Sequence, residues 1–394
     1  MKYLTLLLSV IMIGYGESKA FPLSKEAEIS ILTCSPGTEL YSLFGHTAIR
    51  VYDSSNHTDL VFNYGTFDFS TPHFYLKYAQ GLLPYQLTVG EFPHFLASYK
   101  EEQRTVYSQK LHLDSVQKQK MFDLLLENYC PENRSYLYNF LWDNCTTRSR
   151  DILARSIHDT IEWKIADKSK SFWNLLDEYL KASPWVQWGI HSILGQGGNR
   201  KADTYQTMFL PDYLMQGLNT AFIREHPLAG KAEILYEAPP AKNDYPWYIH
   251  PIFIFAVSTF ILIFLLQKLK CTFFLNTIAI LLFLFSGILG CLIVFLGGFT
   301  AHPITAPNWN ILWANPLNLV VIPFIIRKIL PRFIQIYLKI YLILLIAAIP
   351  AWFLLQPAVP MASVSLIVLM IYLCTKIRNK SKSSMNTTNT TYNN

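Results

Sequence analysis

The chain has 394 residues, of which 51% are hydrophobic and only 15% are charged, and its formal net charge is +6. Its positive mean hydropathy of +0.22 is too high for a single soluble globular protein, so part of the chain must lie in lipid. The modest charge and the lack of a nucleic-acid-binding motif argue against a nucleic-acid partner, and the C-terminal basic residues fall between apolar runs, where they set membrane topology.

Residues 1–20 have the layout of a cleavable secretory signal peptide. Lys2 precedes an apolar run over 4–13, and the small-residue ending Ser18-Lys19-Ala20 follows it. We expect the mature chain to begin at Phe21 and to leave the cytoplasm, where disulfides are permissible. No cysteine follows the cleavage site directly, so the chain is not itself an evident lipoprotein.

Residues 21–247 are predicted to form an α+β domain. Strands are expected over 29–34, 46–52, 60–64 and 104–113, where β-branched and aromatic residues are frequent. A helix is predicted after Asp114, because apolar residues recur with helical spacing up to Cys130-Pro131, at Phe122, Leu125, Leu126 and Tyr129.

The segment His46–Tyr64 is predicted to be a β-hairpin that carries a catalytic histidine. Residues 53–56 supply the turn, and the second arm returns past Asn63, which should lie roughly opposite His46. A general base next to a nucleophile needs a partner that orients its imidazole, and the carbonyl of Asn63 suits that role. The alternative is that His46 is an ordinary, hydrogen-bonded polar residue.

Residues 67–95 are rich in Phe, Tyr and Leu between prolines and glycines. Such a stretch can line an acyl-chain groove that faces a membrane. Core and loop packing of an aromatic-rich domain explains it equally well.

Cys145 is the predicted nucleophile. A strand-like aromatic run over 136–141 precedes it, and a helical stripe begins after Thr147, so its thiol should open a helix. Backbone N–H groups and the helix dipole stabilise a thiolate there, with Asn144 or Asp143 as the cap. The alternative for a single cysteine is a buried small hydrophobic residue.

The cysteine count supports Cys145. The exported part has Cys34, Cys130 and Cys145, whereas the other three cysteines lie in apolar segments. If Cys34 and Cys130 pair, Cys145 is left as the reactive thiol. If all three are reduced, Cys34 is the rival nucleophile, although it precedes a Pro-Gly turn and has no helix start to activate it.

Residues 248–376 are predicted to form a transmembrane domain of about five helical spans. The apolar segments cover 248–267, 273–296, 316–327, 334–355 and 359–375. If the first span enters from the periplasm, the basic clusters after the first, third and fifth segments all face the cytoplasm, as the positive-inside rule requires. The Ser-, Asn- and Thr-rich residues 377–394 are predicted to be a disordered cytoplasmic tail.

The loop over 297–310 should face the periplasm. His302, Asn308 and Asn310 are candidates for contacts with lipid headgroups, and the equally weighted alternative is a polar loop with an interfacial tryptophan. No metal site is expected, because histidines and carboxylates there lack ligand spacing.

Several of these motifs together resemble one family, the Lnb-type bacterial lipoprotein N-acyltransferases. The resemblance spans most of the chain and is carried by the segments Leu32–Gly37, Phe44–His46, Asn63–Phe69, Asp143–Thr147 and Met208–Tyr213. That family is similar in turn to permuted papain-like folds of the NlpC/P60 and lecithin retinol acyltransferase kind, in which the histidine precedes the cysteine. His46 and Cys145 follow that order.

The resemblance implies an inner-membrane enzyme whose catalytic domain is periplasmic. It would move an acyl chain from a phospholipid through a Cys145 thioester to the N-terminal amine of a diacylglyceryl-cysteine lipoprotein, without a dissociable cofactor. Backbone N–H groups at the helix start would hold the oxyanion. The rivals are a cell-wall endopeptidase or amidase with the same Cys-His pair, and a membrane scaffold in which both residues are structural.

Overall fold

The computed structural model describes residues 21–164, 169–240, 245–356 and 360–392, so the expected signal peptide at 1–20 lies outside it. The chain divides into two compact units. We call them the sheet unit, within Met1–Lys170 and Lys201–Ala241, and the helical unit, within Ser171–Arg200 and Lys242–Asn394.

The described part of the sheet unit contains a seven-stranded antiparallel sheet with the strand order β10-β5-β1-β2-β3-β4-β6. Its strands are β1 (Glu28–Cys34), β2 (His46–Asp53), β3 (Thr58–Thr66), β4 (Pro84–Glu91), β5 (Val106–Lys110), β6 (Ser135–Leu137) and β10 (Glu233–Tyr236). A small second sheet contains β7 (Ile161–Glu162), β8 (Phe222–Ile223) and β9 (His226–Pro227).

The described part of the sheet unit also contains helices. They are η1 (Leu40–Ser42), α2 (Phe74–Gln80), α3 (Phe92–Glu101), α4 (Ser115–Tyr129), α5 (Cys145–Ser156), α8 (Thr204–Thr207) and α9 (Pro211–Asn219). The α+β class predicted from the sequence is therefore confirmed.

Alternate residues of the central strands enter different parts of the core. Ile31, Ile49 and Phe62 pack in a core cluster together with residues of α4 and α5. Their sequence neighbours Leu32 and Ala48 pack instead with Phe92 and Phe95 of α3. Because side chains alternate across a strand, the sheet is buried on both faces.

The predicted hairpin is present. Strand β2 pairs antiparallel with β3 from Ile49 opposite Phe62 to Asp53 opposite Thr58. The Asp53 carboxylate accepts hydrogen bonds from Asn56 and from Ser24, which fixes the turn. The turn residues that the sequence indicated therefore act as predicted.

The aromatic run before Cys145 is only partly a strand. Residues 135–137 pair with β4, but Asn139 and Asp143 then close a turn through two backbone hydrogen bonds. The Asn139 side chain accepts from the N–H groups of Leu141 and Trp142 and so competes with a strand ladder. The strand predicted over 136–141 was therefore too long.

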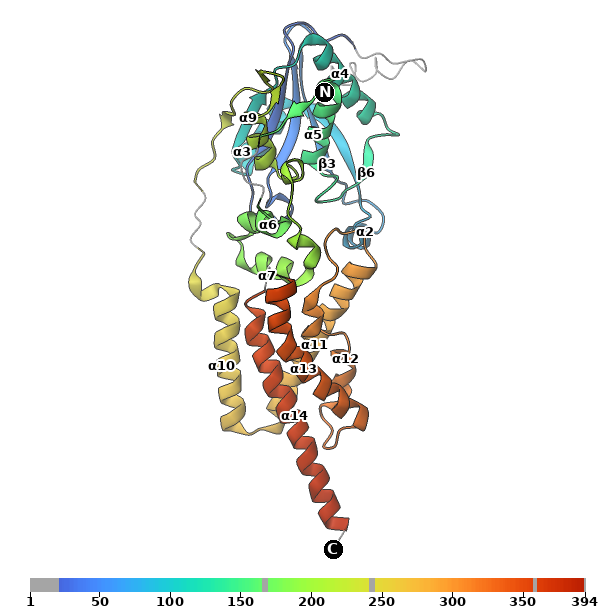
Figure 1. Ribbon diagram of the computed structural model, residues 1–394, viewed down its shortest axis with the longest axis vertical. Coiled ribbons are helices and arrows are strands. Elements are labelled where there is room, and N and C mark those ends of the chain that lie inside the picture. The colour runs from blue at the N-terminus through green and yellow to red at the C-terminus, as the bar shows by residue number, and fades with distance from the viewer. Residues whose placement is uncertain (1–20, 165–168, 241–244, 357–359, 393–394) are drawn as a thin grey trace. The chain divides into compact units, whose positions relative to one another are not determined.

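The helical unit begins with three short elements at residues 171–200, α6 (Phe172–Leu180), α7 (Pro184–Ile193) and η2 (Gln196–Asn199). The later elements are η3 (Trp247–Ile249), α10 (Pro251–Leu269), α11 (Thr272–Gly298), η4 (Trp309–Leu312), α12 (Asn318–Val321), η5 (Ile322–Phe324), α13 (Arg332–Leu355) and α14 (Ser363–Tyr392). The long helices run alongside one another (Figure 1).

Within the described residues, three helices are long and apolar enough to cross a membrane, namely α10, α11 and α13. The third apolar segment, 316–327, instead forms the short α12 and η5, with Pro323 in the second of them. Since a span needs about 20 helical residues, these two pieces are too short to cross as one regular helix. The five-span count stays a prediction.

Two features differ from the sequence prediction for this region. Residues 171–200 join the helical unit, because Gly195 N–H donates to Ile304 O and Asn308 donates to Ser192 O. Helix α14 also continues to Tyr392, where a disordered tail from 377 was predicted. No glycine or proline occurs after Pro360, so nothing in the backbone chemistry stops the helix that the apolar segment starts.

Candidate active site

Cys145 is the first residue of α5, as predicted, and Asn144 is its cap. The Asn144 Oδ1 atom accepts hydrogen bonds from Thr146 N–H at 2.8 Å and Thr147 N–H at 2.9 Å. Its Nδ2 atom donates to the carbonyls of Phe140 and Phe209, at 2.7 and 2.9 Å. One buried amide thus fixes both the helix start and the position of the thiol.

His46 reaches Cys145 from the first residue of β2. The two side chains are hydrogen bonded, and His46 Nε2 lies 2.6 Å from Asn63 Oδ1. Because an amide oxygen only accepts, Nε2 carries a proton there and Nδ1 remains for exchange with the thiol. The structure brings together the three residues that the sequence selected, although the last β2–β3 pair is Ile49 with Phe62, and Asn63 is not the direct cross-strand partner of His46.

The pKa of the Cys145 thiol is low for a side chain that is only 8% exposed. Burial is the largest influence on its pKa and raises it. The positive charge of His46, its hydrogen bond, the Thr47 N–H and the Thr146 hydroxyl outweigh burial and lower the pKa of Cys145 to about 7. Burial lowers the pKa of His46, but the Cys145 thiolate and the Asn63 bond overcome it, so the pKa of His46 is raised.

Cys34, the rival nucleophile, lies in the same region but has the opposite character. It is paired with His46 across β1 and β2, is fully buried and packs against Tyr99 and Val106. Burial raises the pKa of Cys34 to about 12, and the positive charge of Arg104 offsets this only in part. A thiol with that pKa is not a nucleophile near neutral pH.

The sequence left open whether Cys34 pairs with Cys130, and in the structure both thiols are free. Cys34 ends a strand inside the sheet, whereas Cys130 ends α4 and its thiol donates to Leu126 O. Cys145 is therefore distinguished by its surroundings and not by the cysteine count.

Two site residues were missed from the sequence. The Thr47 N–H donates to the Cys145 thiol, and the hydroxyls of Thr47 and Thr146 are 3.1 Å apart. Gly65 has a φ of +90° and is close enough that a Cβ there would lie 3.6 Å from Cys145 Cβ. A glycine two positions after Asn63 was the available signal, since only glycine adopts this backbone freely and leaves room for the thiol.

The loop residues predicted to support the site belong to the helical unit. Asn308 donates to Ser192 O and accepts from Asn310 N–H, while Asn310 donates to His191 O and Ser192 O. His302 also has a partner. Both asparagines thus satisfy backbone groups of residues 191–192, which favours the structural interpretation of this loop.

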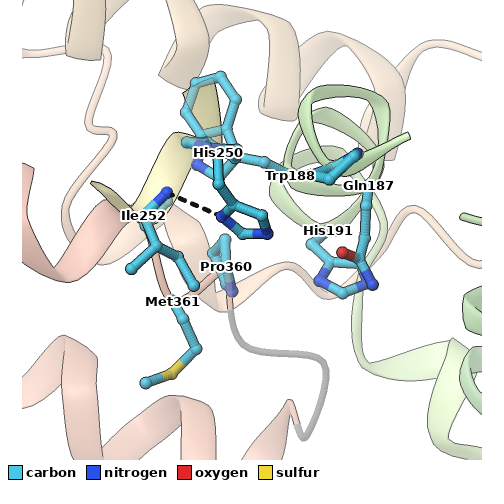
Figure 2. A pocket seen from close by; sticks show the side chains of 10 residues that line it. Gln187, Trp188, His191, His250, Ile252, Pro360 and Met361 are labelled. Carbon is cyan, nitrogen blue, oxygen red and sulfur yellow. Dashed lines mark hydrogen bonds between the residues drawn. The ribbon is translucent and has the colours of Figure 1, made fainter. Parts of the chain in front are cut away.

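The helical unit contains a cavity of about 190 Å³ between α7, the start of α10 and residues 360–362 (Figure 2). Two histidines line it. His191 bonds Asp177 at 2.6 Å, and His250 accepts from Ile252 N–H as the cap of α10. Its lining residues include no cysteine or serine.

Comparison with known families gives two matches along the chain. Residues 21–178 match the Lnb N-terminal periplasmic domain, and residues 243–383 match the Lnb transmembrane domain. The chain belongs to the Lnb family. Searches of curated proteins and of solved structures returned no match.

Membership of the Lnb family fixes the general setting of the site. The protein is an inner-membrane protein with a periplasmic N-terminal domain, and the family points to an enzyme of lipoprotein processing. The Cys145, His46 and Asn63 cluster lies entirely within the residues that match the periplasmic domain.

Proposed function

We propose that this Lnb protein is a cysteine-dependent lipoprotein N-acyltransferase of permuted papain-like fold. A strand that carries the histidine packs against a helix that begins with the cysteine, which suits that fold. The substrates are a phospholipid acyl donor and a diacylglyceryl-cysteine lipoprotein acceptor. The observation that carries the proposal is the Cys145 thiol at a helix start, hydrogen bonded to His46 and lowered in pKa to about 7.

In the first half-reaction, His46 holds the proton of Cys145 and the thiolate attacks an ester carbonyl of the phospholipid. The tetrahedral intermediate collapses as the C–O bond breaks, and His46 returns the proton to the lysophospholipid alkoxide. An acyl thioester on Cys145 remains. Asn63 Oδ1 keeps the imidazole oriented and stabilises its protonated form.

In the second half-reaction, the lipoprotein α-amine attacks the thioester carbonyl. His46 takes the proton that the amine loses as the amide forms, and the Cys145 thiolate leaves. No cofactor is required. This sequence of events restores the starting thiolate and imidazolium.

Fewer backbone N–H groups are available to bind the oxyanion than the sequence suggested. The N–H groups of Thr146 and Thr147 are already bound by Asn144, so they cannot serve. The Cys145 N–H has no acceptor among the described residues and is the donor that we assign to the oxyanion.

A cell-wall amidase would use the same catalytic groups, but the anchor separates the two candidates. The three helices that are long and apolar enough to cross a membrane favour a lipid donor, because an acyl chain taken from the bilayer must be transferred without long exposure to water. A membrane scaffold would not need a thiol of lowered pKa.

The test is mass spectrometry of lipoprotein N-termini in cells that express either the wild type or Cys145→Ser at equal levels. Loss of the N-linked acyl chain with Cys145→Ser is the expected result. Cys130→Ser is the matched control and should retain acylation, because that thiol is remote from the site. Unchanged N-acylation with Cys145→Ser would contradict the proposal.

A further inference from the structure

The connection between β3 and β4, residues 67–83, has an unusual surface. We call it the aromatic arm. Its helix α2 contains no buried residue, and its large apolar side chains are widely exposed, at Phe69 (70%), Tyr75 (81%), Leu76 (55%), Tyr78 (47%) and Leu82 (43%). Exposed apolar surface gathered in this way marks a site of protein or membrane contact.

The aromatic arm is nevertheless ordered by its own ring contacts. Phe67 lies 5.2 Å from Phe69 and 5.8 Å from Phe74, and Phe69 lies 4.9 Å from Phe74, measured between ring centroids. Gly81 caps α2 in a left-handed conformation, and Leu83 is buried. The exposed side chains are therefore presented on a defined scaffold.

A line of aromatic rings connects the arm to the catalytic thiol. Phe67 lies 5.2 Å from Tyr85, and Tyr85 stacks on Tyr138 at 4.4 Å. A Cβ at Gly65 would lie 3.9 Å from the Tyr138 ring and 3.6 Å from Cys145 Cβ. Apolar side chains thus extend from the exposed arm to the reacting atom, which is what an acyl chain requires as it moves to a buried thiol.

We propose that the aromatic arm inserts into the interface of the lipid bilayer and passes the acyl donor along these rings to Cys145. A bilayer is the favoured occupant because the chain is anchored in one by α10, α11 and α13, and it passes between the two units three times, after Lys170, Arg200 and Ala241. Tyrosine and other aromatic side chains also concentrate at membrane interfaces.

The charge of the arm defines the type of contact. Residues 67–83 contain one carboxylate, Asp68, one lysine, Lys77, and one histidine, His73. Insertion therefore depends on apolar side chains and not on attraction to anionic headgroups, so zwitterionic phospholipid is sufficient.

The direct test uses the full-length protein in nanodiscs of zwitterionic phospholipid whose acyl chains are either plain or brominated. Bromine quenches tryptophan fluorescence on contact. The nine native tryptophans give a background that is measured in the unsubstituted protein. The added fluorescence of Tyr75→Trp should be quenched by the brominated lipid, and that of the exposed control Val116→Trp on α4 should not.

Equal fluorescence of Tyr75→Trp in both lipids would overturn the proposal. So would shielding of this tryptophan only after a lipopeptide acceptor is added, since the arm would then be a protein contact. The measurement is repeated with Cys145→Ser, in which bilayer contact should persist without catalysis. Failure of the proposed function and failure of bilayer insertion are therefore distinguishable.

The delivery role rests on the proposed function and has its own test. Leu76→Asp should slow acylation of Cys145 from bilayer phospholipid about tenfold, because a charge replaces an apolar side chain that enters the interface. Alkylation of Cys145 by water-soluble iodoacetamide should be unchanged, and the control Val116→Asp should affect neither rate. Equal acylation rates for Leu76→Asp and the wild type would overturn the delivery role.

Discussion

Two buried thiols in this periplasmic domain show how the surroundings of a residue decide its chemistry. Cys34 and Cys145 both experience burial, which opposes a thiolate. Only Cys145 begins a helix and accepts hydrogen bonds from His46 and from the Thr47 N–H. We therefore expect the thiol of Cys34 to be unreactive near neutral pH and the thiol of Cys145 to be reactive.

Replacement of His46 by alanine tests this balance. In the wild type, alkylation of Cys145 should rise with pH around a midpoint near 7, where the thiol is half ionised. Without His46, its charge and hydrogen bond no longer offset burial, so the pKa of Cys145 should rise and the midpoint should move to higher pH. The pH dependence of iodoacetamide labelling, read by peptide mass spectrometry, checks this. Labelling at Cys34, or a Cys145 midpoint that ignores His46, would contradict it.

At the scale of elements, the start of α5 links stability to reactivity. Asn144 accepts from two N–H groups of the helix and donates to two carbonyls outside it, so it fixes the thiol relative to residues 140 and 209. Because Asn144 occupies the N–H groups of Thr146 and Thr147, the proposed mechanism leaves the Cys145 N–H as the oxyanion donor.

Asn144→Ala should lower the free energy of unfolding by about 1 kcal/mol or more, because a cap and two buried hydrogen bonds are lost. It should also slow acylation of Cys145. Asp114→Ala is a matched control, since Asp114 forms the same capping box on α4 away from the thiol. Denaturant melts should show the larger loss for Asn144→Ala, because Asp114→Ala removes only an exposed cap worth about 1 kcal/mol, and only Asn144→Ala should change the alkylation rate. Equal alkylation rates would show that the cap serves stability alone.

The sequence predicted the elements whose signals are local. The hairpin, its turn at Asp53, helix α4 with its Asp114 cap and the helix start at Cys145 all follow from alternation, capping residues and helical spacing. The signals failed where tertiary contacts decide. Asn139 closes a turn inside an alternating run. Whether Cys34 and Cys130 can pair depends on where the sheet and the end of α4 place the two thiols, and both are free.

The site residues also divide into those with a local sequence signal and those that depend on tertiary contacts. His46 and Cys145 could be selected from residue type and position, because each begins a regular element. Thr47 acts through a backbone N–H, which leaves no pattern in the sequence. Gly65 acts through a missing side chain, and its only sequence signal is the glycine itself.

At the scale of the whole molecule, the distribution of basic residues predicts the orientation of the membrane domain. Lys268 lies in the last turn of α10 and Lys270 follows the helix. A reporter fused after Lys270 should therefore be cytoplasmic, whereas one fused near Thr305 should be periplasmic. Paired alkaline phosphatase and green fluorescent protein fusions measure both positions. Location of the two fusion sites on the same side would contradict the five-span arrangement.

The central claim is that Cys145 carries the acyl chain. Intact-protein mass spectrometry of the full-length enzyme in phospholipid nanodiscs, without an acceptor, measures this directly. The account predicts one added acyl mass on Cys145, absent in Cys145→Ser and removed when a diacylglyceryl-cysteine peptide with a free amine is added. An active enzyme that transfers acyl chains while Cys145 stays unmodified, or an adduct on Cys34, would contradict the account.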